Sequence, residues 1–204
     1  MLIWLWKRLS NGGAEACVSG RALRRFPARD IEGLLRARVL TEQRKADSWS
    51  VCMHCDCGLD ARPIRAVGDQ LLACCPRDVA ADEVLEPDDL RRFGIDADKL
   101  ISAIAASGGL PAAASVVADG LWLLGRPPTG ICVFLCRGTH LLMAPATILA
   151  TRMAAGSAPI TVITMDLDPA TELNLRAAGI EARSLTECVL VDDRRSRSPR
   201  PASS

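Results

Sequence analysis

The spacing of hydrophobic residues predicts helices at the start of the chain and strands that alternate with helices after residue 110. Ile31, Leu34 and Leu35 recur at helical spacing and predict a helix over 27–38, and two further helices are predicted over 1–9 and, after the turn NGG, over 14–25. Next comes VLTEQRKADSWSVC at 39–52, where two short apolar runs flank a polar turn and predict two paired strands. The first part of the chain is therefore predicted to form three helices and a hairpin.

A second hairpin and an acidic helical segment are predicted in the middle of the chain. ARPIRAV at 61–67 and QLLAC at 70–74 have the composition of strands, and the Gly-Asp dipeptide between them is a favoured two-residue turn. Residues 76–109 predict acidic helices, because Pro87 suits a first helical turn and a glycine pair ends the segment.

After residue 110 the pattern predicts a small α/β domain. LWLLG and ICVFLC are predicted as two strands around the turn RPPTG, and residues 141–185 then predict helix, strand, helix and strand. Strands that alternate with helices of this length indicate βαβ units and a small, largely parallel sheet.

The fold class expected from these patterns is α+β in several modules. A helical head precedes a small β-hairpin module, an acidic helical segment, a C-terminal α/β (βαβ) domain and a disordered basic tail. The predicted bounds of these modules are 1–51, 52–78, 79–109, 110–193 and 194–204.

The net charge of +1 hides an uneven distribution of charge along the chain. Residues 1–51 carry ten Lys and Arg against five Asp and Glu, whereas residues 52–125 carry six against twelve. The last eleven residues carry four Arg and no acid in a Pro- and Ser-rich context, which predicts disorder. The head therefore has a balance of +5, which suits contact with a polyanion.

Three helices followed by a hairpin is the order of elements in a winged-helix unit, and residues 1–51 resemble that class in general. The resemblance implies double-stranded DNA as a partner, with one helix in the major groove and basic side chains on phosphates. The alternatives are a solvated basic face, or a docking surface for the acidic segment of a neighbouring protein chain. The candidate nucleic-acid-binding residues are Arg21, Arg24, Arg25, Arg29, Arg36, Arg38, Arg44 and Lys45.

A cluster of cysteines in residues 52–75 predicts a zinc site, because zinc binds four thiolate or imidazole ligands supplied in pairs by two turns. One register combines Cys52-x2-Cys55 with Cys75-x2-Asp78, and a second begins at His54-x2-Cys57, so the fourth ligand stays open. The candidate ligands are Cys52, Cys55, Cys57, Cys74 and Cys75, with His54 and Asp78 as alternatives.

The spacing of these cysteines resembles a degenerate zinc ribbon over residues 52–78, which implies a structural Zn2+ site with no open position for water. A redox pair at Cys52 and Cys55 is one alternative. The other is a ribbon that has lost its metal and keeps its cysteines as small apolar packing residues.

Two weaker constellations lie in the predicted α/β domain. Cys132, Cys136 and His140 would share one face of a helix, but ICVFLC is rich in strand-forming residues, so core packing is favoured for the two cysteines. Asp166 and Asp168 follow the strand ITVITM, at the edge where α/β sheets place ligands. The alternative role for Asp168 is a helix cap before Pro169.

The sequence lacks the common signals of catalysis and of membrane insertion. It has no glycine-rich phosphate loop and no recognisable Ser or Cys nucleophile motif. Its first apolar run is six residues long, too short for a membrane span, and no signal-peptide cleavage site follows. We therefore expect a cytoplasmic protein whose nine cysteines are reduced thiols or metal ligands.

These observations favour a non-enzymatic nucleic-acid-binding or regulatory protein with a structural zinc site. The alternative is a protein–protein adaptor whose α/β domain and acidic segment bind a protein partner. A third hypothesis is a metal-assisted hydrolase that uses Asp166 and Asp168.

Overall fold

The computed structural model of the chain describes residues 1–12, 16–50 and 61–188. Within these ranges the chain is a mixed α+β protein with three β-sheets, so the predicted class is confirmed. Internal contacts divide it into two units: unit 1 comprises Met1–Asn11 with Ala97–Ser204, and unit 2 comprises Gly12–Asp96. Unit 2 is therefore inserted into the chain of unit 1.

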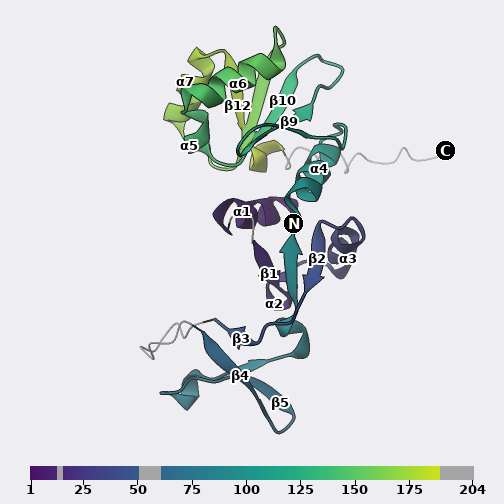
Figure 1. Cartoon of the computed structure of the whole chain (residues 1–204), viewed down its shortest axis with the longest axis vertical. Coiled ribbons are helices and arrows are strands. Elements are labelled where there is room, and N and C mark those ends of the chain that lie inside the picture. The colour runs from purple at the N-terminus through teal and green to yellow at the C-terminus, as the bar shows by residue number, and fades with distance from the viewer. Residues whose placement is uncertain (13–15, 51–60, 189–204) are drawn as a thin grey trace, which may run out of the picture. The chain divides into compact units, whose positions relative to one another are not determined.

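Unit 1 is built on a five-stranded sheet with the order β12-β11-β10-β9-β8 (Figure 1). Strands β10, β11 and β12 run parallel to one another, whereas β9 is antiparallel to β10 and β8 is antiparallel to β9. The βαβ arrangement predicted after residue 110 is thus present. The strands are β8 (Ser115–Ala118), β9 (Leu121–Gly125), β10 (Cys132–Cys136), β11 (Ile160–Thr164) and β12 (Ile180–Ser184).

Three helices cover one face of this sheet, as Figure 1 shows for α5, α6 and α7. Leu142, Ala155 and Leu175 of these helices are buried against Phe134 and Val162 of the sheet. The helices of unit 1 are α1 (Leu2–Gly12), α4 (Ala97–Ser107), α5 (Thr139–Leu142), α6 (Pro145–Ala155) and α7 (Pro169–Ala177).

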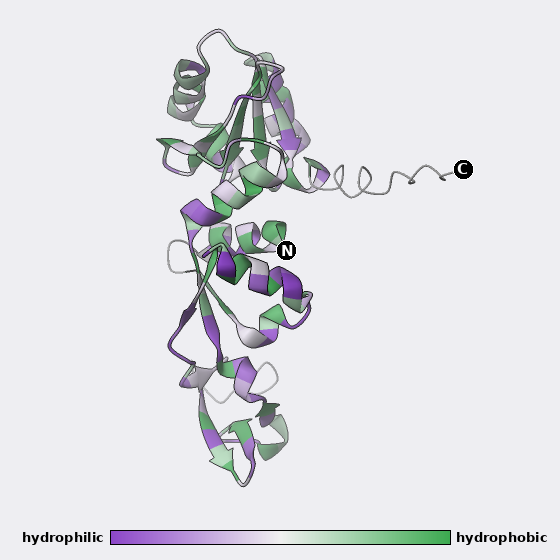
Figure 2. Ribbon diagram, turned by 90° about the vertical axis from the view of Figure 1, so that its right-hand side faces the viewer, coloured by the Kyte–Doolittle hydropathy of each residue, from purple (hydrophilic) through white to green (hydrophobic). Residues whose placement is uncertain are grey.

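The opposite face of the sheet is covered by α1 and α4. Because side chains alternate along a strand, Trp122 and Leu124 of β9 point away from the face that carries Leu121. Trp6 of α1 meets Trp122 edge to face, with ring centroids 5.6 Å apart, and α4 packs against β9. Because helices cover both faces, the three central strands β9, β10 and β11 are hydrophobic along most of their length, whereas the edge strand β12 carries Glu181 and Arg183 (Figure 2).

Unit 2 contains short elements and two antiparallel sheets, with the orders β1-β7-β2 and β3-β4-β5-β6. Its strands are β1 (Cys17–Ser19), β2 (Leu40–Gln43), β3 (Ser48–Trp49), β4 (Arg62–Val67), β5 (Gln70–Ala73), β6 (Glu83–Leu85) and β7 (Arg92–Ile95). Its helices are α2 (Gly20–Leu23), α3 (Ala28–Arg36) and the 3-10 helices η2 (Val79–Ala81) and η3 (Pro87–Leu90). Buried side chains of the first sheet and of α2 form its core: Val18, Leu23, Leu40, Phe93 and Ile95.

The hairpin predicted for residues 39–52 is wrong. Both strands are present, but β2 pairs with β7 and β3 pairs with β4, so they belong to different sheets. The helix predicted for residues 14–25 is also replaced, in its described part, by β1 and the four-residue α2. The winged-helix module is therefore not confirmed, because its order of elements depended on that hairpin.

The acidic segment 76–109 is less helical than predicted. Only α4 is an α-helix there, whereas β6 pairs with β5 and β7 lies between β1 and β2. Partners distant in sequence override the local helical signal of the acidic residues. The hairpin of β4 and β5 is confirmed, with Val67 opposite Gln70 and Gly68 at φ +58 in the turn. In the described part of the chain, no helix combines the length and hydrophobicity that a bilayer span requires.

Candidate functional site

Several of the basic residues predicted to bind nucleic acid are engaged inside unit 2. Arg21 forms an ion pair with Glu83, and its guanidinium lies 5.8 Å from the ring centroid of Trp49. Arg24 lies 2.7 Å from Glu86 Oε2 and 2.7 Å from the buried carboxylate of Asp89. The charges of Arg21 and Arg24 are thus compensated within the unit.

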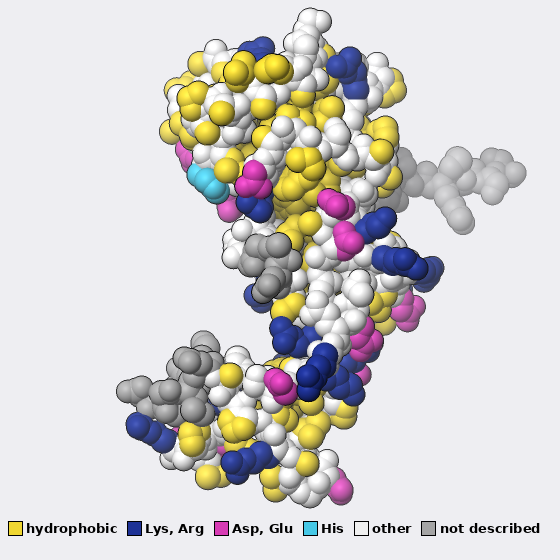
Figure 3. Space-filling view, viewed as in Figure 1, with side chains coloured by type: hydrophobic (Ala, Val, Ile, Leu, Met, Phe, Trp, Pro, Cys, Tyr) yellow, Lys and Arg dark blue, Asp and Glu magenta, His cyan; other side chains and the backbone are white. Residues whose placement is uncertain are grey.

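The remaining predicted residues lie on α3 and in the segments that follow α3 and β2. Arg29 and Arg36 are exposed and seven residues apart on α3, so they lie on the same face of the helix. Arg38, Arg44 and Lys45 are also exposed. Figure 3 shows Lys and Arg side chains, in dark blue, at the place that α3 occupies in Figure 1.

These side chains have little acidic compensation. In the described ranges, no carboxylate lies within 4.0 Å of the cationic groups of Arg36, Arg38, Arg44 or Lys45. Arg29 has only a 3.6 Å contact with Asp30 and is 88% exposed. We call these five residues, Arg29, Arg36, Arg38, Arg44 and Lys45, the basic face of unit 2. Arg25 differs from them, because its guanidinium stacks on Phe26 and donates to Ala22 O.

Part of the predicted zinc cluster lies outside the described residues: Cys52, His54, Cys55 and Cys57. Of the described candidates, Cys75 is buried, Cys74 is half-buried, and Asp78 Oδ1 accepts from Ala80 N–H as the cap of η2. Among the residues that the structure places, no group of three potential metal ligands lies together. The zinc site therefore stays a prediction.

The described residues on either side of 51–60 are joined by hydrogen bonds. Trp49 of β3 lies opposite Arg62 of β4, and the buried Arg62 guanidinium donates to Ser50 O at 2.7 Å. Cys74 N–H donates to Pro63 O at 3.0 Å. Cys74 therefore neighbours β4 just after residue 61, whereas Trp49 and Ser50 lie on the other side of β4 in the sheet order β3-β4-β5-β6.

The two aspartates proposed for hydrolysis have different surroundings. Asp168 caps α7, since its Oδ1 accepts from Thr171 N–H at 2.9 Å and its Oδ2 from Thr171 Oγ1 at 2.6 Å. These hydrogen bonds lower the pKa of Asp168. Asp166 instead lines a cavity. The alternative role that the Asp-Pro dipeptide suggested for Asp168 is thus the one observed.

This cavity of unit 1, of about 210 Å³, is what we call the polar pocket. It lies at the carboxyl ends of β10 and β11, where Arg137, Thr139 and His140 follow one strand and Asp166 follows the other. Lys7, Ser10 and Asn11 of α1 form another wall. The two cysteines considered with His140 do not share this site, since Cys132 and Cys136 are buried in the core of the sheet. Burial raises the pKa of the Cys136 thiol.

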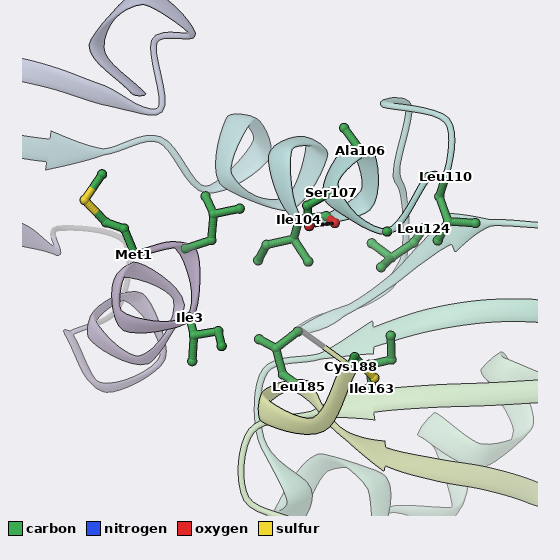
Figure 4. A pocket seen from close by; sticks show the side chains of 13 residues that line it. Met1, Ile3, Ile104, Ala106, Ser107, Leu110, Leu124, Ile163, Leu185 and Cys188 are labelled. Atoms are coloured by element: carbon green, nitrogen blue, oxygen red, sulfur yellow. Dashed lines mark hydrogen bonds between the residues drawn. The ribbon is translucent and has the colours of Figure 1, made fainter. Parts of the chain in front are cut away.

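A larger cavity of unit 1, of about 640 Å³, is lined mainly by hydrophobic side chains (Figure 4). It is surrounded by Met1, by Ile3 of α1, by Ile104 of α4 and by Leu185 after β12. Two polar side chains in its lining are poorly suited to bind a ligand. Ser107 Oγ already donates to Ile104 O at 2.7 Å, and burial raises the pKa of the Cys188 thiol, which favours its neutral form. The cavity therefore offers little that could orient a polar ligand.

Sequence reasoning missed most of the polar pocket. Arg137 and His140 follow a predicted strand as directly as Asp166 follows the next one, so the rule applied to Asp166 would also have indicated them. Lys7 and Ser10 had no such signal, because nothing in the first helix indicates which strands it will pack against. Compared with known proteins, the chain matches no family model, no curated protein and no solved structure, so the interpretation of these sites depends on their own residues.

Proposed function

We propose that unit 2 binds duplex DNA through its basic face. The observation that supports this proposal is the group of exposed cationic side chains on α3 and after β2, four of which have no carboxylate within 4.0 Å in the described chain. Exposed Lys and Arg side chains that have no carboxylate partner can contact phosphates without first breaking an internal ion pair. Arg21 and Arg24 instead hold α2 to the acidic residues of β6 and η3.

The proposal predicts a strong dependence of DNA affinity on salt. Each phosphate neutralised by Lys or Arg contributes a slope of about −0.9 to log Kobs against log salt concentration. Five side chains contacting phosphates would give a slope of roughly −4 to −5. Fluorescence anisotropy of a labelled 20-base-pair duplex, titrated with the full chain at several salt concentrations, measures this slope.

Charge reversal on the basic face provides the decisive test. The Arg36→Glu/Arg38→Glu double variant is expected to weaken DNA binding at least about tenfold at low salt and to make the slope shallower. The matched control is Arg152→Glu/Arg176→Glu, which makes the same charge change at exposed positions of unit 1. An equal loss in both variants, or no DNA retention at low salt, would refute the proposal and favour the adaptor hypothesis.

Neutralising an acidic residue among these cations tests the same proposal by an expected gain in DNA affinity. Glu32 is exposed on α3, one helical turn from Arg29 and one from Arg36. Glu32→Gln is therefore expected to strengthen DNA binding, because it removes repulsion between the carboxylate and phosphate.

We also propose that the cysteines beside the β4–β5 hairpin hold one structural zinc ion. Covalent geometry keeps Cys52 within about 10 Å of Trp49, since three residues span at most roughly 3.5 Å each. Support comes from the sheet order β3-β4-β5, in which Trp49 and Cys74 lie on either side of β4, about two inter-strand spacings or roughly 10 Å apart. Thiolates within this reach of one another suit tetrahedral zinc coordination.

Elemental analysis of the purified chain tests the zinc proposal. We expect about one zinc per chain, lost in Cys52→Ser, Cys55→Ser and Cys75→Ser. Cys17→Ser is the control, because Cys17 lies in β1 and accepts a hydrogen bond from Arg92. Absence of zinc, or its retention in all three variants, would refute this part of the proposal.

A further inference from the structure

We propose that the polar pocket of unit 1 binds a small oxyanion, a carboxylate or a phosphate, that also carries a hydroxyl donor. The pocket lies at the carboxyl ends of two adjacent parallel strands, β10 and β11. In α/β sheets this edge is where loops gather polar groups around ligands. The site is separate from the basic face of unit 2 and does not depend on DNA binding.

Arg137 supplies the main anion-binding group. Its backbone N–H donates to Gly120 O at 2.8 Å, which fixes the residue at the end of β10. Its guanidinium lies 3.7 Å from Asp119, a carboxylate that is itself 91% exposed. This ion pair is long and solvated, so most of the five guanidinium donors remain available for a bidentate contact with an oxyanion.

Ser10 indicates that a hydrogen-bonding partner belongs in the cavity. Ser10 is one of the residues that line the pocket, and its Oγ is buried and has no hydrogen-bond partner among the described residues. A buried hydroxyl without a partner is destabilising, and such groups are uncommon in folded proteins. A ligand oxygen beside Lys7 would accept from Ser10 Oγ and satisfy it.

His140 is positioned by the absence of a side chain at Gly138. A Cβ at Gly138 would lie 2.8 Å from the imidazole Cε1 and 2.9 Å from Nδ1. The ring therefore packs directly over this glycine, and even a methyl group there would displace it.

The charges and the size of the pocket define the class of ligand. Among the lining residues Lys7 and Arg137 face the single carboxylate of Asp166, and Asp119, the distant partner of Arg137, is 91% exposed and screened by water, so the site favours an anion. Asp166 can accept a hydrogen bond from a ligand hydroxyl. A cavity of about 210 Å³ has room for only a small molecule.

Binding of two matched compounds to the full chain tests this assignment. Glycerate and glycerol 3-phosphate share the hydroxyl donor and differ in the oxyanion, and glycerol lacks the charge. Isothermal titration at constant ionic strength is expected to show saturable binding of one or both anions and none of glycerol. The stronger of the two identifies the ligand as carboxylate or phosphate.

Variants connect the binding to the pocket. Arg137→Gln is expected to weaken it at least about tenfold, because a charge-assisted hydrogen bond is lost. Ser10→Ala should weaken binding without lowering the stability of the unliganded chain, since its hydroxyl has no partner there. Gly138→Ala should also weaken binding, because it displaces His140, which lines the pocket and can donate a hydrogen bond to an oxyanion.

The control is Arg176→Gln, an exposed position on α7 that removes the same charge outside the pocket. Absence of saturable binding by either anion would overturn the proposal. So would binding that Arg137→Gln leaves unchanged, or a loss in Arg176→Gln as large as that in Arg137→Gln.

Discussion

Arg62 Nη2 donates to Glu83 Oε2 at 2.6 Å, and this ion pair joins β4 to β6 through side chains. The Arg62 side chain is only 5% exposed, and Nη1 also donates to Ala81 O at 3.0 Å. The same Glu83 oxygen accepts from Trp49 Nε1 at 3.1 Å. Three strands of the second sheet of unit 2 thus meet at one carboxylate.

Removal of Glu83 is expected to destabilise unit 2 strongly. Glu83→Ala leaves the buried guanidinium of Arg62 without its counter-charge, and the loss of one partner from a buried pair costs roughly 3 kcal/mol. Urea unfolding followed by tryptophan fluorescence measures the change. The control is Glu172→Gln on α7, where the exposed pair with Arg176 should contribute less than about 1 kcal/mol. Equal effects of the two variants would contradict this account of the buried pair.

The stability of unit 2 should fall in acid because of the same residue. Burial opposes the ionisation of Glu83, but hydrogen bonds from Arg62 and Trp49 and the charge of Arg21 outweigh it, so its pKa lies below the ordinary 4.5. A lowered pKa in the folded state stabilises the fold above pH 4.5, and this contribution is lost as the pH falls through the folded value.

Comparison with Glu83→Gln isolates this contribution. The difference in urea midpoint between the natural chain and the variant should be largest at pH 7 and should shrink below pH 4.5. A difference that is constant, or that grows toward low pH, would show that Glu83 is not the group responsible.

Two glycines of unit 2 should respond to alanine in opposite ways. A Cβ at Gly20 would overlap the backbone carbonyl of Asp88, so Gly20→Ala must displace η3 and is expected to cost about 1–3 kcal/mol. Nothing lies within 4 Å of a Cβ at Gly33, in the middle of α3, so Gly33→Ala should stabilise the chain by roughly 0.5–1 kcal/mol. Thermal unfolding of both variants checks the signs: a Gly20→Ala that is not destabilised would contradict the packing described for Gly20, and a destabilised Gly33→Ala would contradict the open space at Gly33.

The capping role of Asp168 predicts which substitutions unit 1 tolerates. Asp168→Ala should lower the thermal midpoint, because two hydrogen bonds to Thr171 are lost, whereas Asp168→Asn should keep most of the stability since asparagine is an equally good cap. Asp166→Ala serves as the control at an exposed position of the same loop. A loss in Asp166→Ala as large as that in Asp168→Ala would contradict the capping role.

The sequence predicted the parts of the fold whose signals are local. The strands around Cys132 and Val162, the helix capped by Asp168, and the turn at Gly68 all follow from runs of apolar residues and turn residues within a few positions. The pairing of Val18 with Phe93 could not be predicted in this way. Its strands are three and four residues long, and their partners are distant in sequence.

The prediction of the basic face and of the polar pocket was limited in the same way, because sequence patterns report local structure and not contacts between distant residues. The exposure of Arg36 and Arg44 follows from an amphipathic helix and a short strand, which sequence patterns describe. The engagement of Arg24 by Asp89 depends on tertiary contacts, and so does the presence of Ser10 and Arg137 in the lining of one cavity. Charge counts along the chain therefore identified a basic region but not which of its cations are compensated.

The packing of Trp6 against Trp122 has a consequence for the order of events during synthesis. The first helix emerges from the ribosome before residues 13–96, whereas the strand that receives Trp6 emerges after all of them. Because domains generally fold as units while the chain is still growing, the inserted unit can complete its fold while α1 has no partner. The residues Leu5, Trp6 and Leu9, all buried in the finished protein, thus stay without their packing partners until β9 has been synthesised.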